Sequence, residues 1–263
     1  MLINSVILVL REVLEAAILV TALLALARVI QLGFNWLWPA AVASVAGVIG
    51  LASALGPLTD MLDGTGQEVT NAALQIGVFF VVCAVILDTR ERSDGRHYSA
   101  FTGPLMALAV ALAVTREGSE VLLYVRGFAA VESYRQAVLL GSALGAGIGV
   151  SAGTLCYWAL VTRPGRLAYR LCLASLCLLG AGMVMQGVML LEQAGWLLNV
   201  DPVWNSSWLV SEESVTGELL YAVLGYEATP GRVQLGLYLA SLALAISASI
   251  YAARSPYRGG QTS

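Results

Sequence analysis

The sequence contains no lysine, a single histidine (His97) and only 12% charged residues over its 263 positions. Soluble proteins carry about 25% charged residues, so this chain cannot cover itself with a hydrated surface. Its 14 arginines are outnumbered by 17 acidic residues, which leaves no basic surface for nucleic acid. One histidine also argues against zinc or haem sites and against histidine-based triads. We therefore predict an integral membrane protein that does not bind DNA or RNA.

The sequence is also poor in cysteine. Its four cysteines are Cys83, Cys156, Cys172 and Cys177, and all lie in apolar runs without a CxxC pair. A disulfide framework needs a cysteine-dense extracellular segment, which is missing. We interpret the four thiols as small buried apolar groups.

Seven apolar stretches reach the length of about 20 residues that a transmembrane helix needs. The first is not a secretory signal, because it has no basic start and carries Arg11, Glu12 and Glu15 among its apolar residues. The sequence therefore predicts an all-α membrane protein with seven transmembrane helices. They cover residues 4–31, 38–58, 68–87, 99–128, 136–161, 167–196 and 233–253.

The arginines between these stretches predict the orientation, because the side that keeps Lys and Arg is normally cytoplasmic. One set of connections is acidic, apart from the link after the fourth stretch with Arg126 and Arg135, and the other set is basic. This pattern places the N-terminus outside and the C-terminus in the cytoplasm. Residues 197–232, which contain Trp204, Trp208 and Tyr221, are expected at the outer surface as an interfacial segment with a short amphipathic helix, or as an ordered lid. The basic connections contain Arg90, Arg92, Arg96, Arg163, Arg166, Arg170, Arg254 and Arg258.

One charged pattern, R-E-x-x-E, occurs twice inside the apolar stretches. It is formed by Arg11, Glu12 and Glu15 in the first stretch, and again by Arg116, Glu117 and Glu120 in the fourth. Spacings of three and four residues put each set on one side of its helix. At about 1.5 Å per residue, both sets lie roughly 12 to 18 Å below the outer face. Four carboxylates and two guanidinium groups are therefore expected to meet at one level.

The two patterns are 105 positions apart and lie in helices of opposite direction. This spacing predicts two inverted repeats of three spans, over residues 1–98 and 99–196, followed by the outer segment 197–232 and a seventh span. Transporters built in this way hold their substrate between the repeats near mid-membrane.

Charged groups in the bilayer centre cost about 2.5 to 3.5 kcal/mol each on insertion scales, so six of them call for a function. Each pattern has a net charge of −1, and a site of charge −2 favours a cation. Carboxylate ligands without imidazole or thiolate suit hard ions such as ferric iron, Mg²⁺, Ca²⁺ or Mn²⁺. Glu12, Glu15, Glu117 and Glu120 are the candidate metal ligands, and Arg11 and Arg116 balance their charge. A purely structural clamp between the two helices is the alternative.

Other polar residues extend this picture. Asp60, Asp63 and Glu68 form a candidate capture site at the outer mouth, unless they are only solvated loop charges. Candidates for a pathway are Gln75, Gln186 and Glu192, the last of which could instead be hydrated at the interface. Gly141, Gly145, Gly149 and Gly153 form a glycine stripe that predicts close packing of the fifth span on another helix.

With its two R-E-x-x-E patterns, the chain resembles the oxidase-dependent iron permease family, which includes fungal high-affinity iron permeases and bacterial members. The similarity extends from REVLEA at 11–16 and REGSE at 116–120 to LEQAGW at 191–196 and LGYEATP at 224–230. Ser119 departs from the family pattern, which often has a large apolar residue there. The resemblance implies that the glutamates of both motifs bind iron during transport.

The resemblance also implies an iron permease of a bacterial inner membrane rather than an enzyme. Iron would be the transported ion, no cofactor would be bound permanently, and a separate periplasmic ferroxidase or peroxidase and iron-binding partner would oxidise the iron. Three alternatives remain open at this point. They are a transporter of Mn²⁺, Pb²⁺ or another divalent metal, an intramembrane enzyme with paired glutamates as acid and base, and a structural assembly subunit.

Overall fold

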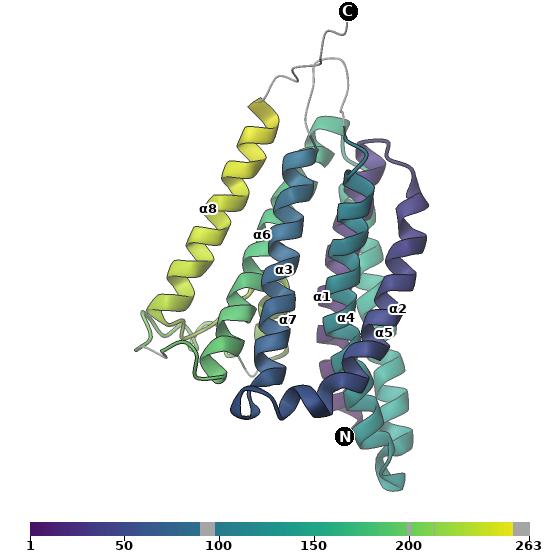
Figure 1. The fold of residues 1–263 in the computed structure, drawn as a ribbon, viewed down its shortest axis with the longest axis vertical. Helices are drawn as coiled ribbons and strands as arrows, with labels where there is room; N and C mark the ends of the chain where they lie inside the picture. Colours follow the sequence, from purple (N-terminus) through teal and green to yellow (C-terminus); the bar gives the residue numbers. More distant parts are fainter. Residues whose placement is uncertain (90–97, 199–200, 213, 255–263) are drawn as a thin grey trace, which may run out of the picture.

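A computed structural model describes residues 1–89, 98–198, 201–212 and 214–254 as a helical bundle, shown in Figure 1. His97 and four of the arginines used above, Arg90, Arg92, Arg96 and Arg258, lie outside these residues. In chain order the helices are α1 (Leu2–Val29), the 3-10 helix η1 (Phe34–Trp36), α2 (Leu37–Thr59), the 3-10 helix η2 (Leu62–Gly64), α3 (Gly66–Asp88), α4 (Thr102–Ala129), α5 (Glu132–Val161), α6 (Gly165–Gln193), α7 (Val215–Leu224) and α8 (Arg232–Arg254). The predicted all-helical architecture is thus confirmed.

Five described segments are long and apolar enough to cross a membrane by length and composition: Phe34–Ala54, Gly66–Asp88, Glu132–Val161, Gly165–Gln193 and Arg232–Ala252. Helices α1 and α4 have 28 residues each and differ from these five by the charged patterns that they carry.

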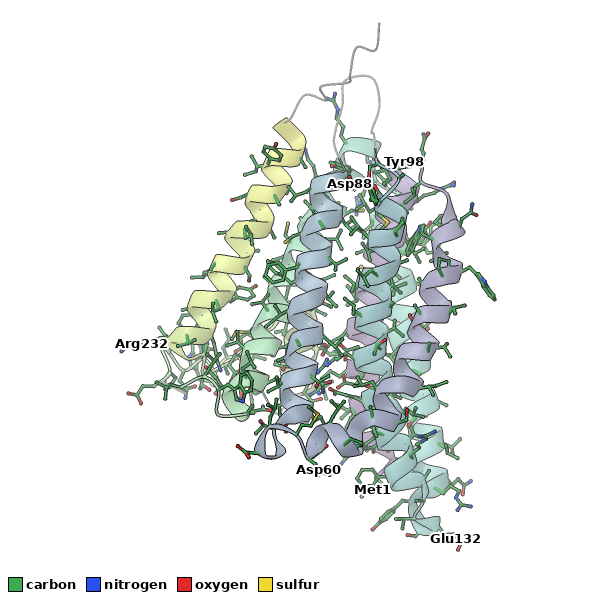
Figure 2. The ribbon with its side chains drawn as sticks, viewed as in Figure 1. Met1, Asp60, Asp88, Tyr98, Glu132 and Arg232 are labelled. Carbon is green, nitrogen blue, oxygen red and sulfur yellow. The ribbon has the colours of Figure 1, made fainter. Side chains whose placement is uncertain are left out.

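The long helices alternate in direction, so their connections gather at two ends of the bundle. Met1, Asp60, Glu132 and Arg232 lie at one end, which we call the Asp60 end, and Asp88 and Tyr98 lie at the other, the Asp88 end (Figure 2). Helix α1 packs against α4, α5 and α6, while α3 packs against α4 and α6. Helix α8 packs against α6 and α3 at the periphery.

The bundle is divided along its length into an apolar half and a polar half. Towards the Asp88 end, α1, α3, α4 and α6 form a continuous apolar core that includes Leu23, Ile86, Met106 and Leu176. The charged patterns begin where this core ends. The apolar half therefore holds the helices together and fixes the relative position of the charged side chains.

The glycine stripe of α5 packs against α1, as the sequence predicts. All four glycines are buried. A Cβ atom added at Gly145 would lie 2.5 Å from the carbonyl oxygen of Val6, and one added at Gly149 would lie 2.9 Å from the side chain of Val13. Only glycine permits this approach of the two backbones, and it fixes the rotation of α1 that turns Glu12 and Glu15 inward.

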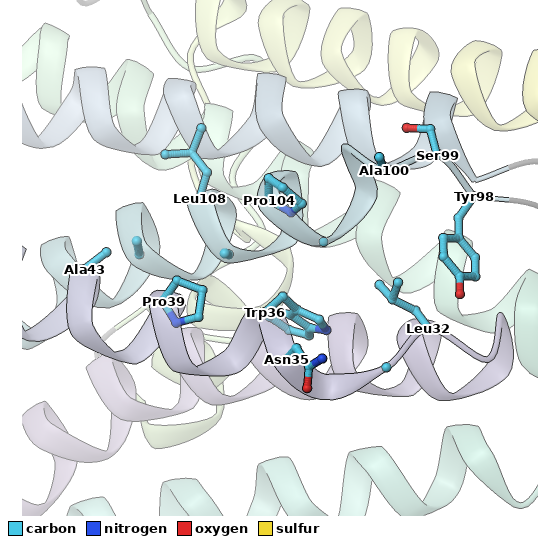
Figure 3. A pocket seen from close by; sticks show the side chains of 14 residues that line it. Leu32, Asn35, Trp36, Pro39, Ala43, Tyr98, Ser99, Ala100, Pro104 and Leu108 are labelled. Carbon is cyan, nitrogen blue, oxygen red and sulfur yellow. The ribbon is translucent and has the colours of Figure 1, made fainter.

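A cavity of about 690 Å³ lies between α2 and α4 towards the Asp88 end (Figure 3). Trp36, Pro39, Pro104 and Leu108 contribute to its apolar wall. No acidic residue lines it. This cavity is consequently separate from the charged patterns and offers no carboxylate ligand to a cation.

Candidate cation site

The two R-E-x-x-E patterns face each other across the contact between α1 and α4. Glu12 and Glu15 on α1 are buried, as are Arg116 and Glu117 on α4. Glu120 lies one turn beyond Arg116, with its side chain 24% exposed. The helical spacing in each pattern therefore directs all four carboxylates to the same place, although the two sequences are 105 residues apart. We call these four carboxylates the acidic cluster.

Arg116 lies at the centre of the acidic cluster. Its Nη1 atom is 2.5 Å from Glu117 Oε2, 3.3 Å from Glu15 Oε2 and 3.7 Å from Glu12 Oε2. Its Nε atom is 3.2 Å from Glu120 Oε1. A single guanidinium group thus contacts all four carboxylates.

Three buried oxygens of the acidic cluster have no hydrogen-bond donor among the described residues. They are Oε2 of Glu12, Oε1 of Glu15 and Oε1 of Glu117. A buried carboxylate oxygen without a donor is costly, and a bound cation would remove that cost. The described carboxylates surround Arg116, and no three acidic, cysteine or histidine side chains among them surround a common point as a formed metal site requires.

Arg11 has different surroundings from Arg116. Its Nε and Nη2 atoms donate to Glu12 Oε1 at 3.0 and 2.7 Å, and it makes no other ion pair among the described residues. The Arg11 side chain is 33% exposed, against 7% for Arg116. The guanidinium of Arg11 lies 5.7 Å from the centre of the Tyr221 ring. The two arginines of the repeated pattern are thus not equivalent.

A cavity of about 340 Å³ connects the acidic cluster with the start of α3 at the Asp60 end. Glu68, a candidate of the predicted capture site, lines this cavity together with Glu12 and Glu120. Asp60 and Asp63 are exposed and do not line it. The complete lining is Leu8, Arg11, Glu12, Gln67, Glu68, Asn71, Glu120, Leu123, Tyr124, Leu190 and Gln193.

A second cavity of about 400 Å³ lies between α1, α4 and α5. Glu12 and Glu117 line it at the level of the acidic cluster. It extends along α1 to Val20 and Thr21, two turns closer to the Asp88 end, and its wall is mostly apolar. The acidic cluster therefore borders one cavity on each side along the bundle.

Two of the predicted pathway residues form a buried hydrogen-bonded pair. Gln75 Nε2 on α3 donates to Gln186 Oε1 on α6 at 2.6 Å, and Gln186 Nε2 donates to the carbonyl oxygen of Tyr221 at 3.4 Å. Neither glutamine lines a cavity described above. On α3, Asn71 Nδ2 donates to Glu120 Oε1 at 3.0 Å, so Asn71 contacts the acidic cluster directly.

Helix α7 packs against α1 and α6, which the sequence alone does not predict for the segment 197–232. It ends at Gly225, whose φ of +65° is left-handed, and this residue contacts Gly182 in the middle of α6. The ring of Tyr221 reaches Arg11 from α7. Sequence reasoning missed Tyr221 and Asn71 as neighbours of the cluster, because neither residue belongs to a repeated pattern.

Hydrogen bonds join the connection before α7 to the connection after it, at the Asp60 end. Glu212 Oε1 accepts hydrogen bonds from the backbone N–H groups of Ala228 and Thr229 at 2.7 and 3.2 Å. At the end of α6, Glu192 Oε2 accepts from Gln234 Nε2 at 2.5 Å. The predicted pathway residue Glu192 thus joins α6 to α8 and does not line the cavity that leads to the acidic cluster.

Glu227 makes the connection after α7 sensitive to pH. Partial burial, together with the nearby Glu212 and Glu192 carboxylates, raises the pKa of Glu227 from 4.5 to about 7. Glu227 therefore binds its proton more tightly when residues 225–231 are packed on the bundle than when they have opened to solvent. The packed state is favoured at low pH, and this contribution to its stability is lost as the pH rises from about 4.5 through about 7.

We expect backbone amides in residues 224–232 to exchange with deuterium faster at pH 8 than at pH 5, after correction for the intrinsic rates. In the Glu227→Gln variant this difference should disappear, because the amide stays neutral at both pH values. Peptides from the last turns of α3, next to Asp88 at the opposite end of the bundle, serve as the internal control. A variant that keeps the full difference would show that another group is responsible.

The chain matches a family of known proteins. The sequence model described as "Iron permease FTR1 family" matches residues 68–255. This match includes the pattern of α4, whereas the pattern of α1 precedes it. No curated protein and no solved structure matches the chain.

Proposed function

The chain belongs to the iron permease FTR1 family and carries iron across a membrane, and from this premise we propose that the acidic cluster is its iron site. Permeases of this family are transporters, not enzymes. Glu12, Glu15, Glu117 and Glu120 would supply the oxygen ligands, and Arg116 would neutralise them between transport events. Ferric iron is the proposed form, because a set of carboxylates without imidazole or thiolate favours hard cations.

The observation that carries this proposal is the contact of four carboxylates with one guanidinium, which leaves three buried oxygens without a donor. A structural clamp between α1 and α4 needs only one arginine and one glutamate from each helix, and buried oxygens without a donor do not stabilise it. A transported cation that replaces Arg116 would bind these oxygens. Because Arg116 competes for the same oxygens, it would keep cation binding weak enough for release.

The packing of the helices supports an inverted repeat and seven spans. If α1, α2 and α3 correspond to α4, α5 and α6, the α1–α5 contact corresponds to the α4–α2 contact. The α1–α6 contact then corresponds to α4–α3, while α1–α4 and α3–α6 each correspond to themselves. All these contacts are present, whereas the α4–α5 contact has no α1–α2 counterpart of similar extent among the described helices. With α1 and α4 counted as spans, the five apolar segments become seven.

The proposed orientation has the Asp60 end outside and the Asp88 end in the cytoplasm of a bacterial inner membrane. Among the described residues, Asp60, Asp63, Glu68, Glu132, Glu212 and Glu218 belong to the Asp60 end together with Arg126, Arg135 and Arg232, whereas Arg28, Arg163, Arg166 and Arg170 belong to the Asp88 end together with Asp88. Excess arginine is typical of the cytoplasmic side. A separate periplasmic ferroxidase or peroxidase is proposed to deliver the oxidised iron.

In this orientation the cavities define a route. Iron would enter past Glu68 into the 340 Å³ cavity, exchange water for the carboxylates of Glu12 and Glu120, and displace Arg116. It would leave through the 400 Å³ cavity towards the Asp88 end after a movement of the two repeats against each other. Asp60 and Asp63 remain proposed for an earlier capture step at the surface.

Uptake of radioactive iron into proteoliposomes tests this proposal. We expect the parent protein to carry iron, and an excess of Mn²⁺ or Pb²⁺ to compete poorly, because a site of four carboxylates favours the ion of higher charge. Equal competition would favour the alternative, a permease with a divalent substrate. Parent-like iron uptake by Glu12→Gln, Glu15→Gln, Glu117→Gln and Glu120→Gln at matched protein levels would contradict the assignment of the site.

A further inference from the structure

The two arginines of the repeated pattern would be equivalent if the repeats alone determined their positions. Arg116 contacts all four carboxylates, whereas Arg11 contacts only Glu12 and lines the cavity at the Asp60 end. Arg11 and Glu15 are one helical turn apart on α1, which is the spacing at which such side chains pair. No salt bridge joins them among the described residues, and Arg11 is paired with Glu12 instead. We therefore look for a further element that keeps Arg11 on Glu12.

Helix α7 is the element that differs between the two surroundings. It contacts α1, lies outside the proposed repeats and has no counterpart beside α4. Its Tyr221 ring lies 5.7 Å from the guanidinium carbon of Arg11. Cations within about 6 Å of an aromatic ring are attracted to its face. Tyr221 thus supplies the second contact of Arg11, besides Glu12.

The backbone of α7 is held firmly enough to position this ring. The carbonyl oxygen of Tyr221 accepts hydrogen bonds from the Gly225 N–H at 2.8 Å and from Gln186 Nε2 at 3.4 Å. Gln186 is itself held by Gln75. Gly225 packs so closely on Gly182 that a Cβ added at Gly182 would lie 3.1 Å from the Gly225 nitrogen. The buried glutamine pair therefore helps to hold the backbone of Tyr221 in place.

We propose that Tyr221 is a positioning residue that holds Arg11 on Glu12 at the edge of the acidic cluster, away from Glu15, and so determines how tightly the cluster binds its cation. This proposal rests on the proposed iron site. With the ring present, Arg116 competes with iron for all four carboxylates, and Arg11 competes only for Glu12. Without the ring, Arg11 can also turn towards Glu15, so that two guanidinium groups compete for more than one carboxylate. Cation binding is then weaker, while the ligands and the route are unchanged.

The test compares Tyr221→Leu, which removes the aromatic ring, with Tyr221→Phe, which keeps it. For Tyr221→Leu we expect a KM for iron uptake about three- to tenfold above that of the parent, and a maximal rate within about twofold, since cation–π contacts are worth such factors. Tyr221→Phe should stay close to the parent. Titration with Tb³⁺, a hard trivalent probe that binds carboxylates, should show the same weakening in the purified protein without transport.

The decisive comparison is made in the Arg11→Gln background. If Tyr221 acts through Arg11, Tyr221→Leu has no further effect on KM or on Tb³⁺ binding there. A full effect in that background overturns the proposal. Tyr226→Leu controls for loosening of the segment 197–232. The Tyr226 hydroxyl is hydrogen-bonded to the Val210 carbonyl and the Ser206 hydroxyl within this segment, and not to Arg11. An equal KM shift in this control also overturns it. A parent protein that neither carries iron nor binds Tb³⁺ would instead reject the proposed iron site.

Discussion

Replacing Glu117 by glutamine should reduce iron uptake by roughly 100-fold, the upper end of the loss seen when only a supporting group of a metal ligand is removed. Glu117 makes the shortest contact of the cluster, 2.5 Å from Arg116 Nη1, and its other oxygen has no donor. The substitution keeps the shape of the side chain and removes one negative charge. The cluster then has three carboxylates to offer a cation, with Arg116 still present.

The thermal stability of Glu117→Gln separates the transport role from a structural clamp. Removing one partner of a buried ion pair normally costs about 3 to 5 kcal/mol, because the other charge is left without compensation. Arg116 would keep three carboxylates here, and the cluster would lose a repulsive charge. We therefore expect an unfolding temperature equal to or above that of the parent. Uptake and stability that fall together would favour the clamp. Glu132→Gln, at the exposed start of α5, is the matched control.

The second large effect is expected at Gly145, where leucine should prevent α5 from packing on α1. The first atom of the new side chain would lie 2.5 Å from Val6 O and 2.9 Å from Leu10 N, and these backbone atoms cannot rotate away. Overpacking of this kind costs about 1 to 3 kcal/mol, and more where only backbone can yield. The yield of monodisperse protein and its unfolding temperature should both fall.

Gly147→Leu is the control for this experiment. It lies on the same helix two positions away, and an added Cβ meets nothing within 4 Å. We expect this variant to be produced and to unfold like the parent. Similar losses in both variants would mean that any leucine in α5 is harmful, and the close contact with α1 would then not be the cause.

The elements of the fold could be predicted from the sequence because they depend on local properties. Apolar length gave the positions of the long helices to within a few residues, and the glycine stripe of α5 identified a close helix contact. The R-E-x-x-E spacing placed each group of charges on one helix face, since helical geometry is the same wherever the helix lies. Repetition of the pattern then predicted that Glu12, Glu15, Glu117 and Glu120 lie near one another.

The segment between α6 and α8 shows where such reasoning ends. Its composition fits an interfacial helix, but Gly225 contacts Gly182 in the middle of α6 and Tyr221 reaches Arg11. Neither contact leaves a pattern in the sequence, because each joins residues of different elements with no fixed spacing. Gln75 and Gln186 were likewise recognisable as buried polar residues, but not as partners of each other.

By itself, the sequence determined a helical membrane protein with two matching sets of charges, because apolar length and helical periodicity act within single segments. The tertiary structure alone decided which arginine occupies the cluster and which lies at its edge. Arg11 and Arg116 have the same neighbours along the chain, so only packing can distinguish them. The presence of α7 beside α1 supplies that difference.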